Sequence, residues 1–405
     1  MAARGRTART LWAFSVAIFC LAGVTGRADA NPGFARKYSV GCQMCHIAFP
    51  KLNNFGEQFA RNGYQFPNEE PAKNSVRLGD ERLLLPTSPN FAIRADGFFR
   101  VRNDTAINND IESPWILKLF SYGLLAKDIA YYFYFLASEG GDVVGPEDAF
   151  LYFNNIAGGL DWDAVVGQFQ VMDSFYAREQ RLTFQDLSIY KANVMETVGA
   201  GGSFDLTYDR GAFTTFSTGP LYTMVGVTNG NGLRSADAND NFDDNGYKNK
   251  MGRVALGLPG ATVGVFGYHG KTNPIAPGTV PNRFNRWGPD LTLHLGPRAD
   301  LRATWLWGRD EHPTFSTTDT PVSHNGGFAE FDVHLNDRWT GVLLYNEVVA
   351  DELPELQVRT LTANLTYYKM RNLKFMAEYT HDLQPRTSVH PGKTHTGVLG
   401  VVLAY

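Results

Sequence analysis

Hydrophobic and polar residues alternate with a period of two along most of the chain after residue 90. In 93–102 one parity carries apolar side chains, while the other carries mostly charged ones. The same split returns further along the chain, in 299–307, 329–335, 361–367 and 373–379. The pattern predicts extended strands with one apolar and one polar face.

A long succession of such strands favours a transmembrane β-barrel, which has an apolar outer face and a polar lumen. A soluble β-sandwich is the alternative, since its core face is also apolar and its outer face is wet. Aromatic-rich strand ends, alternately short and long turns and a closing strand at Val398–Tyr405 favour the barrel. We count about 16 candidate strands from Phe91 to Tyr405 and predict a mainly β fold, an outer-membrane antiparallel β-barrel.

The region before the barrel follows a helical period instead. From Phe34 to Pro67, apolar residues including Leu52, Phe55 and Phe59 share one helix face. Pro50 is expected at the start of this helix, and Asn62-Gly63 provides a stop signal.

The first thirty residues have the pattern of an export signal. Arginines at positions 4, 6 and 9 precede an apolar run over 11–24, and Ala-Asp-Ala at 28–30 offers a cleavage site. Cys20 is expected to be lost with the signal, because bulky Phe19 disfavours a lipoprotein cleavage site. No later apolar stretch approaches the roughly 18 residues that a membrane-spanning helix needs. The expected organisation is a signal peptide (1–30), a short helical segment (31–67), a connector (68–89) and a porin-like barrel (90–405).

Composition agrees with this organisation. The chain is 13% aromatic, contains 41 glycines and has a formal charge of −4. These values suit many short strands with polar turns, and show no basic bias of the kind that nucleic acid requires. We therefore expect outer-membrane lipid around the barrel and no nucleic-acid partner.

Cys42, Cys45 and His46 carry the chemistry. Two thiols three residues apart, followed at once by a histidine, can bond both haem vinyl groups and offer an imidazole to the iron. We predict one covalent c-type haem (heme c) on Cys42 and Cys45, with His46 as an axial ligand of the iron. A zinc half-site would need further ligands at set spacings, yet the nearest other histidine is His269. A dithiol redox pair would need a βαβ setting.

The motif identifies residues 31–67 as a monohaem cytochrome c segment, which we call the haem segment. It is too short to cover both faces of a haem by itself. We therefore expect it to fold into the barrel, or across its mouth, as a plug. The sequence does not identify the second axial ligand of the iron, because the segment has no other histidine and its one methionine lies between the cysteines. Candidates by residue type alone are Met172, Met195, His334 and Met376.

The haem segment resembles the outer-membrane fused monohaem cytochrome-porin family of the iron-oxidising type. The residues that carry this resemblance are Phe34-Ala35-Arg36, Cys42-Gln43-Met44-Cys45-His46, Phe49-Pro50, Leu52, Phe55-Gly56, Phe59 and Gly63-Tyr64. By position, Cys42, Cys45 and His46 take the family's haem-binding roles. The resemblance implies that Phe49, Leu52, Phe55 and Phe59 line the haem's surroundings.

The resemblance also implies an oxidoreductase in the outer membrane of a Gram-negative bacterium. Electrons would pass from an extracellular donor, ferrous iron first, through the haem to a periplasmic soluble cytochrome c or similar carrier. Three alternatives stay open: a conduit for a donor other than iron, a diffusion porin with a structural or sensory haem plug, and a soluble periplasmic β-protein with a haem appendage.

Two charged features remain. The polar faces of the strands carry both basic and acidic residues. We expect their arginines to form ion pairs that cross-link the barrel wall rather than to bind the haem propionates. The basic residues are Arg94, Arg100, Arg102, Arg302 and Lys374, and the acidic ones are Asp96, Glu330, Asp332 and Glu378. An acidic loop could attract ferrous ions through oxygen ligands, although we expect a solvated loop. Its members are Asp237, Asp240, Asp243 and Asp244.

Overall fold

A computed structural model describes most of the chain after residue 32. The described residues are 33–66, 75–76, 79, 85–86, 90–103, 107–174, 176–202, 204–243, 245–273, 280–384 and 394–405. The predicted signal peptide and most of the predicted connector lie outside them.

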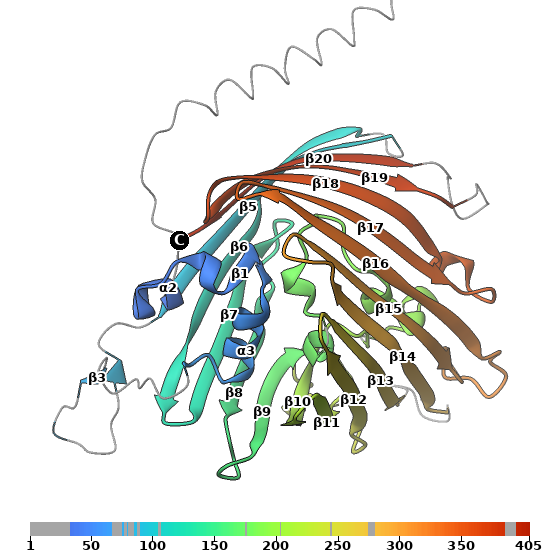
Figure 1. Cartoon of the computed structure of the whole chain (residues 1–405). Coiled ribbons are helices and arrows are strands. Elements are labelled where there is room, and N and C mark those ends of the chain that lie inside the picture. The colour runs from blue at the N-terminus through green and yellow to red at the C-terminus, as the bar shows by residue number, and fades with distance from the viewer. Residues whose placement is uncertain are drawn as a thin grey trace, which may run out of the picture.

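Sixteen strands form a closed barrel (Figure 1). Each strand pairs antiparallel with its neighbour in the chain, and β20 pairs with β5 to close the ring. The strands are β5 (Phe91–Arg102), β6 (Asn109–Ala126), β7 (Ile129–Glu139), β8 (Gly145–Phe153), β9 (Asp161–Gln170), β10 (Tyr208–Thr218), β11 (Leu221–Thr228), β12 (Asn249–Leu258), β13 (Ala261–Thr272), β14 (Asn282–His294), β15 (Ala299–Asp310), β16 (Val322–Asn336), β17 (Trp339–Val349), β18 (Val358–Met370), β19 (Leu373–Asp382) and β20 (His395–Ala404). The predicted fold is confirmed.

The apolar parity of the strands faces outward. Val254 and Val265 are each 55% exposed, whereas their chain neighbours Arg253 and Phe266 are 4% and 1% exposed. Such an exterior is stable only against lipid, and a closed ring satisfies every backbone hydrogen bond within the bilayer. Antiparallel barrels of this kind lie in the outer membrane of Gram-negative bacteria.

Aromatic pairs mark both ends of the apolar exterior. Trp287 and Trp307 have ring centroids 4.8 Å apart, near the connections that follow β15 and precede β14. Trp339, at the start of β17, and Tyr367, near the end of β18, are also 4.8 Å apart and lie toward the other end of the barrel. Aromatic girdles at the two membrane interfaces are typical of outer-membrane barrels.

The connections are short at one end of the barrel and long at the other. The short-turn end includes 127–128, 219–220, 259–260, 337–338 and 371–372. The long-loop end includes 171–207, 229–248, 311–321 and 383–394. In bacterial barrels the short turns face the periplasm, which orients this barrel in the membrane.

One long connection, 171–207, folds back into the lumen, and we call it the lumen insertion. Its short helical elements are η4 (Val171–Ser174), η5 (Arg178–Gln180), η6 (Ser188–Lys191) and α4 (Val194–Thr197). Tyr190 and Met195 are buried in one hydrophobic cluster with Phe328 and Leu344 of the wall. Sequence reasoning did not identify this insertion, because its apolar residues are also compatible with barrel strands.

The N-terminal segment is less helical than predicted. It comprises α2 (Gly33–Tyr38), η2 (Cys42–Met44), a hairpin of β1 (His46–Ala48) and β2 (Lys51–Leu52), and α3 (Asn54–Arg61). Beyond it, β3 (Ser75–Val76) and β4 (Leu85–Pro86) form a small two-stranded sheet. No helix among the described residues is long and apolar enough to cross a membrane.

The expectation that Pro50 starts the helix is wrong. Pro50 lies in the turn between β1 and β2, and the helix begins after Asn53. The Asn53 side chain accepts a hydrogen bond from the Gly56 backbone N–H at 2.9 Å, so a capping residue, rather than proline, sets the start. The predicted stop is confirmed, because Asn62 is the C-cap and Gly63 has a φ of +62°.

Candidate haem site

The N-terminal segment docks on the inner wall at the short-turn end of the barrel (Figure 1). The Phe49 carbonyl accepts hydrogen bonds from the Tyr368 hydroxyl at 3.0 Å and from Lys374 Nζ at 3.3 Å. On the other side, the Tyr152 hydroxyl donates to the Arg61 carbonyl. These wall residues lie next to short turns, so the segment occupies the mouth that faces the periplasm.

Lys51 anchors the segment most deeply. Its ammonium pairs with Asp332 of β16 and lies 3.6 Å from Asp300 of β15, and its side chain is fully buried. Sequence reasoning missed this lysine. The available signal was the only lysine or arginine between Lys37 and Arg61, opposite a wall whose polar parity carries Asp300 and Asp332.

Aromatic stacking completes the docking on β6 and β7. Phe34 stacks on Tyr122 with a centroid separation of 3.9 Å, and Tyr64 stacks on Tyr132 at 5.4 Å. Such pairs contribute about 0.5–1.5 kcal/mol each beyond the area that they bury. The segment thus borrows barrel residues for its apolar surroundings.

A pocket of about 380 Å³ lies between the segment and the wall. This volume is within the range of small-molecule and cofactor sites. From the segment it is lined by Cys42, Gln43, His46, Ile47, Ala48, Phe49 and Asn53. From the barrel it is lined by Pro297, Arg298, His334, Asn336, Asp337, Thr340, Tyr368 and Arg371.

His46 has the hydrogen bond that an iron-ligating imidazole requires. Its Nδ1 lies 3.0 Å from the Pro50 carbonyl, which can only accept, so Nδ1 carries the proton. Nε2 is then the nitrogen with a lone pair for a metal. Burial lowers the pKa of His46, which keeps the ring neutral, as metal ligation needs.

The two cysteines are held close to α3. The Asn53 N–H donates to the Cys45 carbonyl at 2.9 Å, and a Cβ at Gly56 would collide with that same carbonyl oxygen. Only glycine allows the helix to approach this closely. Burial raises the pKa of both Cys42 and Cys45, so both side chains are thiols at neutral pH.

Of the three phenylalanines that the resemblance places around the haem, one lines the pocket and two do not. Phe49 lines the pocket with Cys42 and His46. Phe55 and Phe59 lie outside the pocket lining and pack with each other, at 6.5 Å, and with Phe66. Leu52 pairs with His46 in the hairpin.

The four candidates for a second axial ligand lie in different parts of the barrel. Only His334 lines the pocket that contains His46. Met172 and Met195 are buried in the hydrophobic cluster of the lumen insertion. Met376 packs with Phe98 and lines a different cavity.

Arg100 cross-links the wall as expected, because it pairs from β5 with Glu112 of β6. Arg94 pairs at 2.7 Å with Asp96 of its own strand, and Arg302 pairs at 3.2 Å with Glu57 of the N-terminal segment. The arginines that line the pocket beside His46 are Arg298 and Arg371, which come from short turns and which sequence reasoning missed. Neither forms an ion pair within the described part of the chain.

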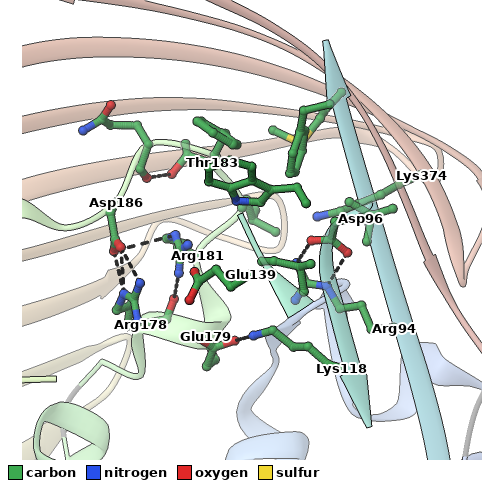
Figure 2. Close-up of a pocket in the computed structure, with 18 of the residues that line it drawn as sticks. Arg94, Asp96, Lys118, Glu139, Arg178, Glu179, Arg181, Thr183, Asp186 and Lys374 are labelled. Carbon is green, nitrogen blue, oxygen red and sulfur yellow. Dashed lines mark hydrogen bonds and ion pairs between the residues drawn. The ribbon is translucent and has the colours of Figure 1, made fainter. Parts of the chain in front are cut away.

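A second cavity, of about 270 Å³, lies between the lumen insertion and the wall (Figure 2). Arg178 pairs there with Asp186 at 2.6 Å, and Lys118 reaches from β6 to Glu179 at 2.5 Å. Its described lining has seven basic residues, Arg94, Arg100, Lys118, Arg178, Arg181, Lys191 and Lys374, against four acidic ones, Asp96, Glu139, Glu179 and Asp186. The space is polar and carries a net positive charge.

The acidic loop between β11 and β12 has local partners. Asp237 accepts hydrogen bonds from the backbone of Asn239 at 2.8 Å and of Asn241 at 2.9 Å. Asp243 pairs with Lys248, and Asp244 lies outside the described residues. Across the described chain, no group of three or more His, Cys, Asp and Glu side chains is placed to hold a metal ion.

The comparisons with known proteins agree with the barrel. No protein-family model and no curated protein sequence matches the chain. Among solved structures it is similar to Salmonella typhi OmpF in complex with daunomycin (TM-score 0.57, 11% identity, 78% of this chain and 97% of that one). It is also similar to the outer membrane channel DcaP of Acinetobacter baumannii (0.55, 10%, 78% and 97%) and to OmpT of Vibrio cholerae (0.54, 9%, 81% and 99%). The chain therefore has the fold of outer-membrane porins.

Proposed function

We propose that the protein is an outer-membrane electron-transfer cytochrome-porin with one c-type haem at the periplasmic mouth of its barrel. The single observation that supports this best is the pocket beside Cys42 and His46, where the Pro50 carbonyl leaves His46 Nε2 available to a metal. The Cys-X-X-Cys-His order supplies the attachment chemistry. When bound, the haem supplies a one-electron redox change.

Each residue of the site has a distinct role. Cys42 and Cys45 would hold the haem covalently and His46 would hold its iron. Arg298 and Arg371 would face its carboxylate groups, since guanidinium groups bind carboxylates strongly. Lys51 fixes the segment to the wall through Asp332.

The position of the pocket is compatible with electron transfer from the haem to a periplasmic carrier. A soluble cytochrome c or similar carrier in the periplasm can approach the short-turn mouth directly. A donor outside the cell must instead be reached along the lumen, past the lumen insertion. Ferrous iron is the leading donor, because iron oxidised outside the cell leaves its insoluble product there.

The test is an anaerobic titration of the detergent-solubilised protein with ferrous iron, followed by the absorption bands of reduced haem. We expect these bands to appear in the wild type, and the Cys42→Ala/Cys45→Ala variant to lack covalent haem. If the wild type carries haem that ferrous iron leaves oxidised, iron is excluded as the donor. If the wild type carries no covalent haem, the proposal as a whole is wrong.

The cavity beside the lumen insertion favours a second candidate, a diffusion porin whose haem is structural or sensory. Its net basic lining would favour anions. Conductance in planar bilayers at the level of open porins, with anion selectivity, would support this function. A blocked barrel would exclude it.

A further inference from the structure

We propose that His334 of β16 is the second axial ligand of the haem iron. One ligand would then come from the N-terminal segment and the other from the barrel wall. The inference rests on the proposed haem attachment at Cys42, Cys45 and His46, and it adds the residue that completes the coordination.

His334 and His46 line the same pocket, and they come from separate elements. His46 begins β1 in the docked segment, and His334 lies near the end of β16 at the short-turn end. His334 is 8% exposed. Two imidazoles that line one pocket from separate elements can supply the two axial ligands of a six-coordinate haem iron.

The orientation of the His334 ring leaves one nitrogen without a hydrogen bond. Nδ1 lies 3.2 Å from the Thr340 hydroxyl, whereas Nε2 is buried and has no hydrogen-bond partner among the described residues. Asp300 Oδ2 is 3.9 Å from Nε2, beyond hydrogen-bond distance, and the same oxygen lies closer to the Lys51 ammonium, at 3.6 Å. A buried nitrogen left in this way is costly unless a ligand satisfies it.

The backbone at His334 departs from regular strand geometry. The pairing of β16 with β17 shifts register between His334 and Asn336, so the strand carries a bulge there. The His334 N–H donates to the Arg298 carbonyl at 2.7 Å, which fixes the backbone beside the pocket. Bulges at barrel rims often redirect a side chain toward a functional site.

His324 also has a buried ring without a hydrogen bond among the described residues, so this feature alone does not identify an iron ligand. It lies on the same strand and parity, is 3% exposed, and has no hydrogen-bond partner on either ring nitrogen among the described residues. It does not line the haem pocket. The pocket is therefore the observation that distinguishes His334, and His324 provides a matched control.

Ligation by His334 would have a mechanical consequence. A bond from the iron to β16 would tie the haem segment to the wall, in addition to the Lys51 ion pair. It would also give the iron two histidines in place of the histidine and methionine pair that raises haem potentials. The segment would then be held most firmly when the haem is present.

The test uses purified haem-loaded full-length protein and compares His334→Ala with His324→Ala. We expect the wild type and His324→Ala to give low-spin six-coordinate haem by absorption and electron paramagnetic resonance. We expect His334→Ala to become high-spin, and added imidazole to restore the low-spin signal. His334→Met should stay six-coordinate, with a thioether-to-iron charge-transfer band and a higher midpoint potential.

Three results would overturn the inference: a high-spin wild type, a low-spin His334→Ala variant, or loss of the low-spin signal in Met376→Ala or Met172→Ala instead. If His334→Ala fails to fold, His334→Gln keeps most of the side-chain volume without a strong iron ligand and must give the same high-spin shift. Absence of covalent haem from the wild type would refute the proposed function itself. A haem-loaded protein that His334→Ala leaves unchanged would refute only the ligand assignment.

Discussion

The ammonium of Lys51 is paired with the carboxylate of Asp332, and both side chains have zero exposure to solvent. The pair joins a short N-terminal hairpin to the inner wall of a barrel strand about 280 residues away in the sequence. Asp300 lies within 3.6 Å of the same ammonium. Loss of the lysine would leave two buried carboxylates without their shared cation.

Replacing Lys51 with methionine should therefore release the haem segment. Removing one partner of a buried ion pair costs about 3–5 kcal/mol. We expect faster chymotrypsin cleavage between residues 33 and 66 in the detergent-solubilised protein. The control is Lys248→Met, which removes a half-exposed ion pair with Asp243 in a loop. Equal cleavage rates in both variants would show that Lys51 does not anchor the segment.

Gly56→Ala should lower covalent haem incorporation. The added methyl group would collide with the Cys45 carbonyl and push α3 away from the attachment site. We expect overpacking of about 1–3 kcal/mol and a reduced ratio of haem to protein by pyridine haemochromogen assay. Gly41→Ala is the matched control, because a Cβ there meets nothing within 4 Å and its φ of −77° suits alanine. An unchanged ratio in Gly56→Ala would contradict this prediction.

Neutralising the pocket arginines should lower the midpoint potential. Arg298 and Arg371 line the pocket, and positive charge there stabilises the more negative, reduced state of a haem. We expect Arg298→Gln and Arg371→Gln each to shift the potential downward in spectroelectrochemical titrations. Arg338→Gln, in a neighbouring turn and outside the pocket lining, should leave it unchanged. A shift of equal size in Arg338→Gln would show only a general charge effect.

Glu378→Ala should loosen the lumen insertion. Its carboxylate accepts hydrogen bonds from the backbone N–H groups of Phe184 at 2.7 Å and Gln185 at 2.8 Å. Leaving buried donors unsatisfied costs about 1–3 kcal/mol, so we expect higher single-channel conductance in planar bilayers. The exposed Glu355, in the short 3-10 helix η7 (Pro354–Leu356), provides the control variant Glu355→Ala. If conductance does not change, the insertion does not limit the pore.

Val254→Lys should destabilise the barrel in lipid. Val254 lies near the middle of β12 and is 55% exposed on the outer face. A lysine at the bilayer midplane costs about 2–4 kcal/mol in outer-membrane barrels. Urea titration of folding into lipid vesicles measures the loss, and Val254→Leu should show almost none. Equal stability of the two variants would mean that this face does not meet lipid.

The sequence by itself determined the barrel and the attachment motif, because both are local patterns. Alternation in 93–102 separates an apolar from a polar face of β5, and the long succession of such strands predicts that the apolar faces meet lipid. Cys42, Cys45 and His46 lie within five residues, so their spacing can be recognised in the sequence before the fold is known. The end of α3 at Asn62-Gly63 was equally predictable, since a helix stop depends on its own residues.

Only the tertiary structure decided how the candidate site is completed. His334, Met172, Met195 and Met376 are equivalent by residue type, and closure of the barrel brings His334 alone to the pocket of His46. The docking of Lys51 on Asp332 and the folding of 171–207 into the lumen also depend on contacts between distant parts of the chain. A periodic pattern identifies which face of a strand is buried, but the partner at each position depends on the register and closure of the whole barrel.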